Sequence, residues 1–266
     1  MQTLNFMKTF FVHITLVLLV TGLFLGCSDD DSSSEPQPTI RLQMDAALGN
    51  FLVDQDGRTL YVFSPDVDGN SACAGGCLDR WPVFNTDEII LGDGLDEADF
   101  GTIQGNDGPQ ITFKGWPLYY FAPGADGVIE ESGETGGEGV GNVWYVAKSY
   151  SLMIARQEVT PGEDAELHLV DIMGNTLYRF TVDEPGTSNC TGGCISAWPV
   201  FPNPSELVLP STLNSTDFSV ISRTDGEGDQ LAYQGSPLYY FAQDNSRGDS
   251  NGQGVNNVWF VVNPSL

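Results

Sequence analysis

Short runs in which apolar and polar residues alternate recur along the chain, and each leads through a glycine into a second run rich in aromatic residues. Alternation with a period of two puts one set of side chains on one face of a β-strand, and two such runs joined by a glycine turn are typical of a β-hairpin. The pattern therefore predicts four hairpins, which we call repeat units one to four. Their second runs read GRTLYVFSPD from residue 57, GWPLYYFAPG from 115, GNTLYRFTVD from 174 and GSPLYYFAQD from 235.

The chain also repeats on a longer scale. The stretch SACAGGCLDRWPVF, residues 71–84, returns as SNCTGGCISAWPVF, residues 188–201, so that equivalent residues lie 117 positions apart. A nearly constant offset of this kind indicates tandem duplication. Each copy ends in a run, NVWYVA or NVWFVV, that is typical of a closing strand.

No segment shows convincing helical periodicity apart from one turn predicted near residues 95–100, so the sequence predicts an all-β fold. We expect two tandem antiparallel β domains built from the repeated hairpins, at residues 40–150 and 160–266. A single propeller-like ring of four blades is the alternative arrangement of the same hairpins.

The beginning of the chain is predicted to lie outside the fold. An apolar run, Phe10–Leu25, follows the single charged residue Lys8 and ends in Gly26-Cys27. This order is typical of a secretory signal, and the residues LFLGC resemble a bacterial lipobox. Residues 1–26 are therefore predicted to be a lipoprotein signal peptide and Cys27 the lipid-modified first residue of the mature chain. A transmembrane anchor is the alternative for the same run.

Residues 27–39 are acidic and rich in serine and proline, so they are expected to form an unfolded tether. The first residues after Cys27, Ser28–Asp31, resemble the surface-export signal of some Gram-negative lipoproteins. We therefore expect an outer-membrane lipoprotein that is exposed on the cell surface and attached to the membrane through its lipid.

The chain is strongly acidic, with 36 Asp and Glu against 10 Lys and Arg and a formal net charge of −26. Such a charge repels nucleic acid and anionic lipid headgroups, so no nucleic-acid partner is expected. The sequence does not identify a protein or glycan partner. The plain interpretation of the negative charge is solubility, and the alternative is a cationic partner or a divalent ion.

Apart from Cys27, four cysteines form two CxxxC pairs, and an even number at repeated spacing in an exported chain favours disulfides. The glycines between them let the backbone bend enough to bring the sulfur atoms together. A redox couple is the alternative, although Arg80 is the single nearby base in one copy and Ala197 takes its place in the other. The predicted disulfide residues are Cys73, Cys77, Cys190 and Cys194.

Haem and zinc fit these pairs poorly. Attachment of c-type haem requires a histidine after the second cysteine, where Leu78 and Ile195 stand. His168 is the one histidine of the predicted mature chain, which leaves a zinc site short of ligands unless the two cysteine pairs meet. The alternation around His168 predicts a half-exposed strand residue, and one histidine cannot give each copy a Ser-His-acid triad. We therefore predict that the chain is not an enzyme.

The acidic loops offer one weak metal candidate. Residues 66–71, DVDGNS, present oxygen atoms at Asp66, Asp68 and Asn70, which makes calcium a candidate ligand. The glycine is misplaced for an EF-hand, and the second copy loses the pattern, so the calcium candidate is weak. No other cofactor is expected. Asp66 and Asp183 follow strand ends, where carboxylates commonly cap turn amides.

Three repeat units carry a tyrosine, one residue, an aromatic residue, two residues and an aspartate. With the cysteine loop and the GQG…VWFVV ending, this pattern resembles a family of bacterial lipoproteins known as the secreted repeat of unknown function. Repeat unit two departs from it, because Gly124 replaces the aspartate and Asp126 comes two residues later. The family positions are Tyr61, Phe63, Asp66, Tyr178, Phe180, Asp183, Tyr239, Phe241 and Asp244.

The resemblance implies an exported, lipid-anchored repeat protein and brings no established activity. The leading hypothesis is a surface-anchored, non-enzymatic lipoprotein with a binding or envelope-structural role. The alternative is an extracytoplasmic redox or electron-transfer protein that uses the CxxxC pairs or a bound metal.

Overall fold

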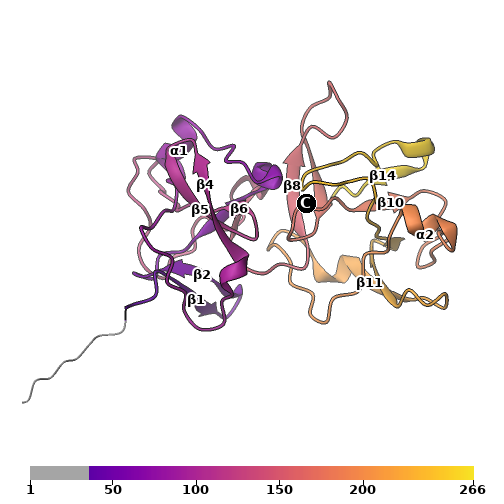
Figure 1. Cartoon of the computed structure of the whole chain (residues 1–266), viewed down its shortest axis with the longest axis horizontal. Helices are drawn as coiled ribbons and strands as arrows, with labels where there is room; N and C mark the ends of the chain where they lie inside the picture. The colour runs from indigo at the N-terminus through magenta and orange to yellow at the C-terminus, as the bar shows by residue number, and fades with distance from the viewer. Residues whose placement is uncertain (1–35) are drawn as a thin grey trace, which may run out of the picture. The chain divides into compact units, whose positions relative to one another are not determined.

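The computed structural model describes residues 36–266 (Figure 1). The predicted signal peptide at 1–26, the lipid attachment at Cys27 and nearly all of the predicted tether lie outside this range. Within it, no helix has both the length and the apolar character needed to cross a membrane.

Short strands dominate both copies, as the alternation predicts. The first half contains short stretches of 3₁₀ helix at Ser64–Asp68 (η1), Glu97–Asp99 (η2) and Val140–Asn142 (η3). Its other elements are β1 (Ile40–Asp45), β2 (Gly49–Asp54), β3 (Tyr61–Phe63), α1 (Gly76–Arg80), β4 (Phe100–Gly105), β5 (Gly108–Phe113), β6 (Trp116–Pro117) and β7 (Trp144–Val146).

The second half repeats the order of strands. Its 3₁₀ stretches are η4 (Ser215–Asp217) and η5 (Val255–Asn257). Its other elements are β8 (Met153–Gln157), β9 (Glu166–Val170), β10 (Tyr178–Phe180), α2 (Gly193–Ala197), β11 (Phe218–Ser222), β12 (Asp229–Tyr233), β13 (Ser236–Pro237) and β14 (Trp259–Val261).

The strands pair antiparallel in small sheets. In the first half β1 pairs with β2, β4 with β5 and β6, and β3 with the closing strand β7. The second half has the same three sheets, β8-β9, β11-β12-β13 and β10-β14. The predicted all-β fold of tandem antiparallel hairpins is therefore confirmed. Among residues 36–266 no sheet has the four strands of a propeller blade.

Repeat units one and three stay paired as hairpins only near their turns. In unit one the turn brings Val53 opposite Thr59, and the Leu60 amide donates to the Leu52 carbonyl. The next residues then leave β2 and pair with β7 as strand β3, where the Phe63 ring stacks on Trp144. The pairing of β3 with β7, and of β10 with β14, closes each half.

Repeat units two and four are tight hairpins with matching turns. The turn residues Lys114 and Gly115 have φ of 48° and 79°, and Gln234 and Gly235 have φ of 48° and 80°. Two consecutive positive φ values define the turn whose twist suits a two-residue hairpin.

Apolar side chains gather in three clusters. One cluster draws leucines from both halves, including Leu52, Leu60, Leu169 and Leu177, each with an exposed fraction of 0%. The other two clusters are rich in aromatic residues, and each belongs to one half. Residues 36–266 form one compact unit, and the division into domains at 40–150 and 160–266 stays a prediction.

Arg247 reaches from the second half into the first. Its Nε donates to the Val67 carbonyl at 2.7 Å and its Nη1 to the Lys114 carbonyl at 2.9 Å. The guanidinium carbon also lies 5.0 Å from the centre of a Trp116 ring. Trp116 in turn donates from its Nε1 to the Ile172 carbonyl at 2.6 Å.

Candidate functional site

The four CxxxC cysteines are joined as predicted. Cys73 bonds to Cys77 and Cys190 to Cys194, with Cα atoms 5.4 Å and 5.3 Å apart. The first cysteine of each pair is buried, and the second is half-buried at the start of the short helix α1 or α2. The sequence did not predict these helices, because five residues are too few to show a helical period.

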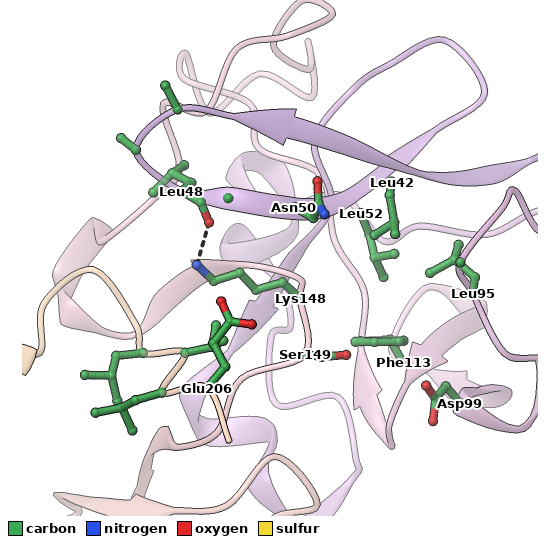
Figure 2. Close-up of a pocket in the computed structure, with 17 residues that line it drawn as sticks. Leu42, Leu48, Asn50, Leu52, Leu95, Asp99, Phe113, Lys148, Ser149 and Glu206 are labelled. Carbon is green, nitrogen blue, oxygen red and sulfur yellow. Dashed lines mark hydrogen bonds between the residues drawn. The ribbon is translucent and has the colours of Figure 1, made fainter. Parts of the chain in front are cut away.

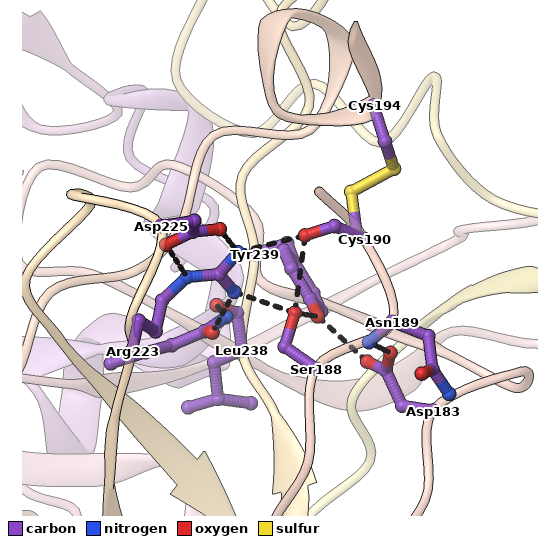
Figure 3. The surroundings of a disulfide bond; sticks show 10 residues. Asp183, Ser188, Asn189, Cys190, Cys194, Arg223, Asp225, Leu238 and Tyr239 are labelled. Carbon is purple, nitrogen blue, oxygen red and sulfur yellow. Dashed lines mark hydrogen bonds and ion pairs between the residues drawn. A yellow bond between two sulfur atoms is a disulfide. The ribbon is translucent and has the colours of Figure 1, made fainter. Parts of the chain in front are cut away.

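A side chain from a distant hairpin holds the backbone of each disulfide loop. Figure 3 shows the guanidinium of Arg223, from the end of β11, beside Cys190; Nη2 donates to the Cys190 carbonyl at 2.8 Å, and Asp225 forms an ion pair with the same group. In the first half Asn106 Nδ2 donates to the Cys73 carbonyl at 3.0 Å. These side chains bond to backbone oxygen atoms, so their role in the loop is structural. Their distance along the chain concealed them from sequence reasoning.

The family tyrosines and aspartates are brought together crosswise between neighbouring repeat units. The Tyr119 hydroxyl of unit two donates to Asp66 of unit one at 2.7 Å. In the second half Tyr239 donates to Asp183 and Tyr178 to Asp244, each at 2.7 Å. The phenol of one unit is therefore satisfied by the carboxylate of the other.

Glu130 completes this exchange in the first half. Gly124 stands where the fourth unit has Asp244, and the Tyr61 hydroxyl donates instead to the carboxylate of Glu130. The amide of Gly136 donates to the other Glu130 oxygen at 2.9 Å, as the amide of Asn251 does to Asp244. Sequence reasoning missed Glu130, because it lies outside the family spacing.

Burial governs the protonation of these groups. Asp66 has an exposed fraction of 0%, and burial raises its pKa to about 7, although hydrogen bonds from the Ala72 amide and Tyr119 oppose this rise. Burial also raises the pKa values of Asp183, Asp244 and Glu130 above their ordinary range. The pKa values of the four partner phenols are raised for the same reason.

The tyrosines surround a stack of aromatic rings in each half. The Trp81 and Trp144 rings lie 3.7 Å apart at 4°, with Phe63 stacked on Trp144 at 3.9 Å and Phe121 next to Trp81 at 4.6 Å. The second half repeats this stack, with Trp198 and Trp259 3.8 Å apart at 3°. Most of the family aromatic positions therefore lie in buried clusters.

The calcium candidate residues are occupied by other contacts. Both oxygens of Asp66 accept hydrogen bonds from protein groups. The two oxygens of Asp68 accept from the amide and the side-chain nitrogen of Asn70, both at 2.9 Å. Among residues 36–266 no three His, Cys, Asp or Glu side chains are grouped as metal ligands. Calcium binding stays a prediction.

His168 corrects one expectation from the sequence. It was predicted to be half-exposed, but its exposed fraction is 0%. It lies on β9 opposite Ala155 of β8, and both ring nitrogens lack hydrogen-bond partners. Burial therefore lowers the pKa of His168 to about 4. The alternation in β9 did not reveal this burial, because both faces of the strand are covered.

An open cleft of about 560 Å³ lies beside β1, β2 and β5 (Figure 2). Its apolar walls come from β1, β2 and β5 of the first half and from residues 207–209 of the second half. The cleft is lined by Leu42, Ala46, Ala47, Leu48, Gly49, Asn50, Leu52, Gly94, Leu95, Asp99, Phe113, Lys148, Ser149, Glu206, Leu207, Val208 and Leu209.

Two charged side chains, Lys148 and Glu206, extend into the same part of this cleft (Figure 2). Lys148 is half-buried, and its Nζ donates to the Leu48 carbonyl at 2.7 Å, which leaves donor capacity on the ammonium group. Burial lowers the pKa of Lys148. The cleft therefore combines an apolar wall with the ammonium group of Lys148 and the carboxylates of Glu206 and Asp99, of which Asp99 is ion-paired with Lys114 at 2.6 Å.

The model of a protein family described as a secreted repeat of unknown function matches residues 43–85, 167–201 and 219–263. The stretch that contains Gly124 and Glu130, where the family spacing is lost, lies outside these matches. No curated protein and no solved structure matches the chain. The chain therefore contains three stretches that match the repeat of a family described as a secreted repeat of unknown function.

Proposed function

We propose that this chain is a surface-anchored, non-enzymatic lipoprotein whose folded repeats bind a small amphiphile. The secretory pattern of residues 1–26, the cysteine at position 27 and the family description as secreted support export and lipid attachment. The two disulfides also fit an oxidising compartment.

The cleft is the observation that carries the binding role. Its volume of about 560 Å³ lies within the range of small-molecule sites, and its walls include the buried side chains of Leu52 and Phe113. An apolar ligand body lies against these walls, and a carboxylate at its end meets the ammonium group of Lys148. Glu206 disfavours a second negative charge at the same place.

Calorimetric titration of the mature chain with dodecanoate tests this proposal. We expect binding that the Lys148→Met variant weakens and the Glu206→Gln variant strengthens, because these changes remove attraction and repulsion for the carboxylate. The methyl ester of dodecanoate controls for the apolar contribution. Absence of dodecanoate binding, or weaker binding by Glu206→Gln, would contradict the assigned ligand class.

The lipid anchor has a separate test. The Cys27→Ser variant is expected to lose incorporation of radiolabelled palmitate and to leave the membrane fraction, while the native chain on intact cells is cut by added protease. A native chain without label refutes the anchor, and protection from protease refutes surface exposure.

The disulfide-cycling alternative is distinguished by paired serine variants. Opening a five-residue loop is expected to cost about 2 kcal/mol of unfolding free energy by the loop-entropy relation, with the dodecanoate affinity unchanged. A reduction potential close to that of the cellular thiol pool would instead favour redox cycling.

A further inference from the structure

Every tyrosine that packs edge-on against the paired indoles donates its hydroxyl to a carboxylate. Tyr119 lies 5.1 Å from Trp144 and donates to Asp66, while Tyr61 lies 5.5 Å from Trp81 and donates to Glu130. The second half repeats both contacts: Tyr239 and Tyr178 lie 5.2 Å and 5.4 Å from its tryptophans and donate to aspartates.

Buried tyrosines away from the indoles can use neutral acceptors. Tyr145 donates to the Asn142 carbonyl and Tyr150 to the Val146 carbonyl, at 2.8 Å and 2.9 Å. A neutral oxygen satisfies a phenol at a lower desolvation cost than a buried carboxylate. Tyr120 and Tyr240, also away from the indoles, donate to carboxylates of Asp54 and Asp171 at 2.8 Å and 3.0 Å. The four flanking tyrosines are distinguished by combining a carboxylate, which can accept the phenolic proton, with edge contact to an indole pair.

The first half keeps this base although the family aspartate is missing. Glu130 approaches Tyr61 from a different position in the sequence and restores the phenol–carboxylate pair. Burial raises the pKa values of Glu130 and Asp244, which makes each a stronger proton acceptor than a free carboxylate. The two halves thus reach the same chemistry by different residues.

We propose that each pair of stacked tryptophans, with its flanking tyrosines and carboxylates, is a one-electron relay. A one-electron oxidant outside the protein removes an electron from the indole pair, and a flanking tyrosine returns an electron to it. The phenolic proton moves at the same time to the bonded carboxylate. The balanced step turns oxidant, phenol and carboxylate into reduced oxidant, phenoxyl radical and carboxylic acid.

The stacked indole rings provide the contact for the electron transfer in this step. The centres of the indole rings lie 3.7 Å apart in the first half and 3.8 Å apart in the second, so the rings are already in contact. The half-buried rings of Phe63 and Phe180 each stack on one tryptophan of the pair, Trp144 and Trp259. This relay is independent of the proposed amphiphile binding in the cleft.

Flash-quench oxidation of the mature chain by a photogenerated ruthenium(III) polypyridyl complex tests the relay. We expect an indole radical to decay into a tyrosyl radical, seen by transient absorption and by electron paramagnetic resonance of chain labelled at tyrosine. The transfer is expected to slow in D₂O, because the proton moves with the electron. A radical that remains on tryptophan, or transfer without a solvent isotope effect, overturns the proposal.

Variants locate the groups involved. Replacing the four flanking tyrosines by phenylalanine is expected to abolish the tyrosyl signal, while the matched control Tyr145→Phe/Tyr150→Phe leaves it unchanged. Asp66→Asn/Asp183→Asn keeps an oxygen acceptor but lowers the yield from Tyr119 and Tyr239. An unchanged yield in that variant overturns the role of the carboxylates. If the tyrosine variants do not fold, the isotope effect and the radical assignment in the native chain still decide whether the relay operates.

Discussion

Phe51 and His168 occupy equivalent positions in the two copies, 117 residues apart, and both have an exposed fraction of 0%. A phenyl ring at this position buries no polar atom. The imidazole buries two nitrogens without partners, which disfavours its charged form and lowers the pKa of His168 to about 4. At this position, the stability of the second half is therefore more sensitive to acid than that of the first half.

The His168→Phe variant is expected to resist acid better than the native chain. The pKa of the folded state, about 4, lies below the ordinary value of 6.5, so the stability that neutral His168 allows is complete above pH 6.5 and is lost as pH falls toward 4. The gap in unfolding free energy between variant and native chain should widen by about 3 kcal/mol over this range. Urea titrations at several pH values measure it, and a constant gap contradicts the prediction.

Loss of the Glu130 carboxylate is expected to destabilise the fold. Glu130→Ala leaves the buried hydroxyl of Tyr61 and the amide of Gly136 without their acceptor, which should cost about 1–3 kcal/mol. Glu131→Ala is the matched control, since its side chain is exposed. Chemical denaturation compares the two. Equal midpoints for both variants would show that Glu130 does not replace the missing aspartate.

The sequence indicated the family tyrosines and aspartates but not their partners. The spacing from Tyr61 to Asp66 suggests a contact inside one repeat unit, whereas Tyr119 of the next unit bonds to Asp66. Which phenol reaches which carboxylate depends on how two units pack, and no local pattern records it. Glu130 and Arg223 were missed for the same reason.

Among the elements, the two tight hairpins differ in what lies beside their turns. A Cβ atom on Gly115 would lie 1.8 Å from Nη1 of Arg247, whereas the nearest atom to one on Gly235 would be Pro185 Cβ at 3.3 Å. The two glycines have φ of 79° and 80°, so the cost of positive φ is the same for both. The turns therefore form a natural matched pair.

Gly115→Ala is expected to destabilise the chain more than Gly235→Ala. Both pay about 1 kcal/mol for a left-handed alanine, and the first must also displace Arg247. In an Arg247→Ala background the excess cost should disappear. Thermal denaturation of the four variants measures the difference, and an excess that persists without Arg247 contradicts this explanation.

Elements were predictable where a local pattern determined them. The closing strands β7 and β14 and the 3₁₀ turn η2 lie where the sequence predicts them. The pairing of β3 with β7 was not predictable, because it joins residues more than 80 positions apart and depends on the packing of Trp144. Strand existence was thus easier to predict than strand partnership.

At the scale of the whole molecule, one leucine-rich cluster and the Arg247 contacts join the halves. Native unfolding is therefore expected to be a single cooperative transition. Arg247→Ala removes two hydrogen bonds from a charged donor and should lower stability by about 2 kcal/mol or more without splitting the transition. Calorimetry measures both effects. Two separate native transitions would instead support independent domains at 40–150 and 160–266.

The crossed phenol–carboxylate bonds also bear on how such chains can lengthen during evolution. A single added unit would bring a tyrosine and an acid whose counterparts belong to a missing neighbour, and burying them unmatched is unfavourable. Growth by a pair of units avoids this penalty. The heritable building block is accordingly the closed half, and stable relatives should contain an even number of units.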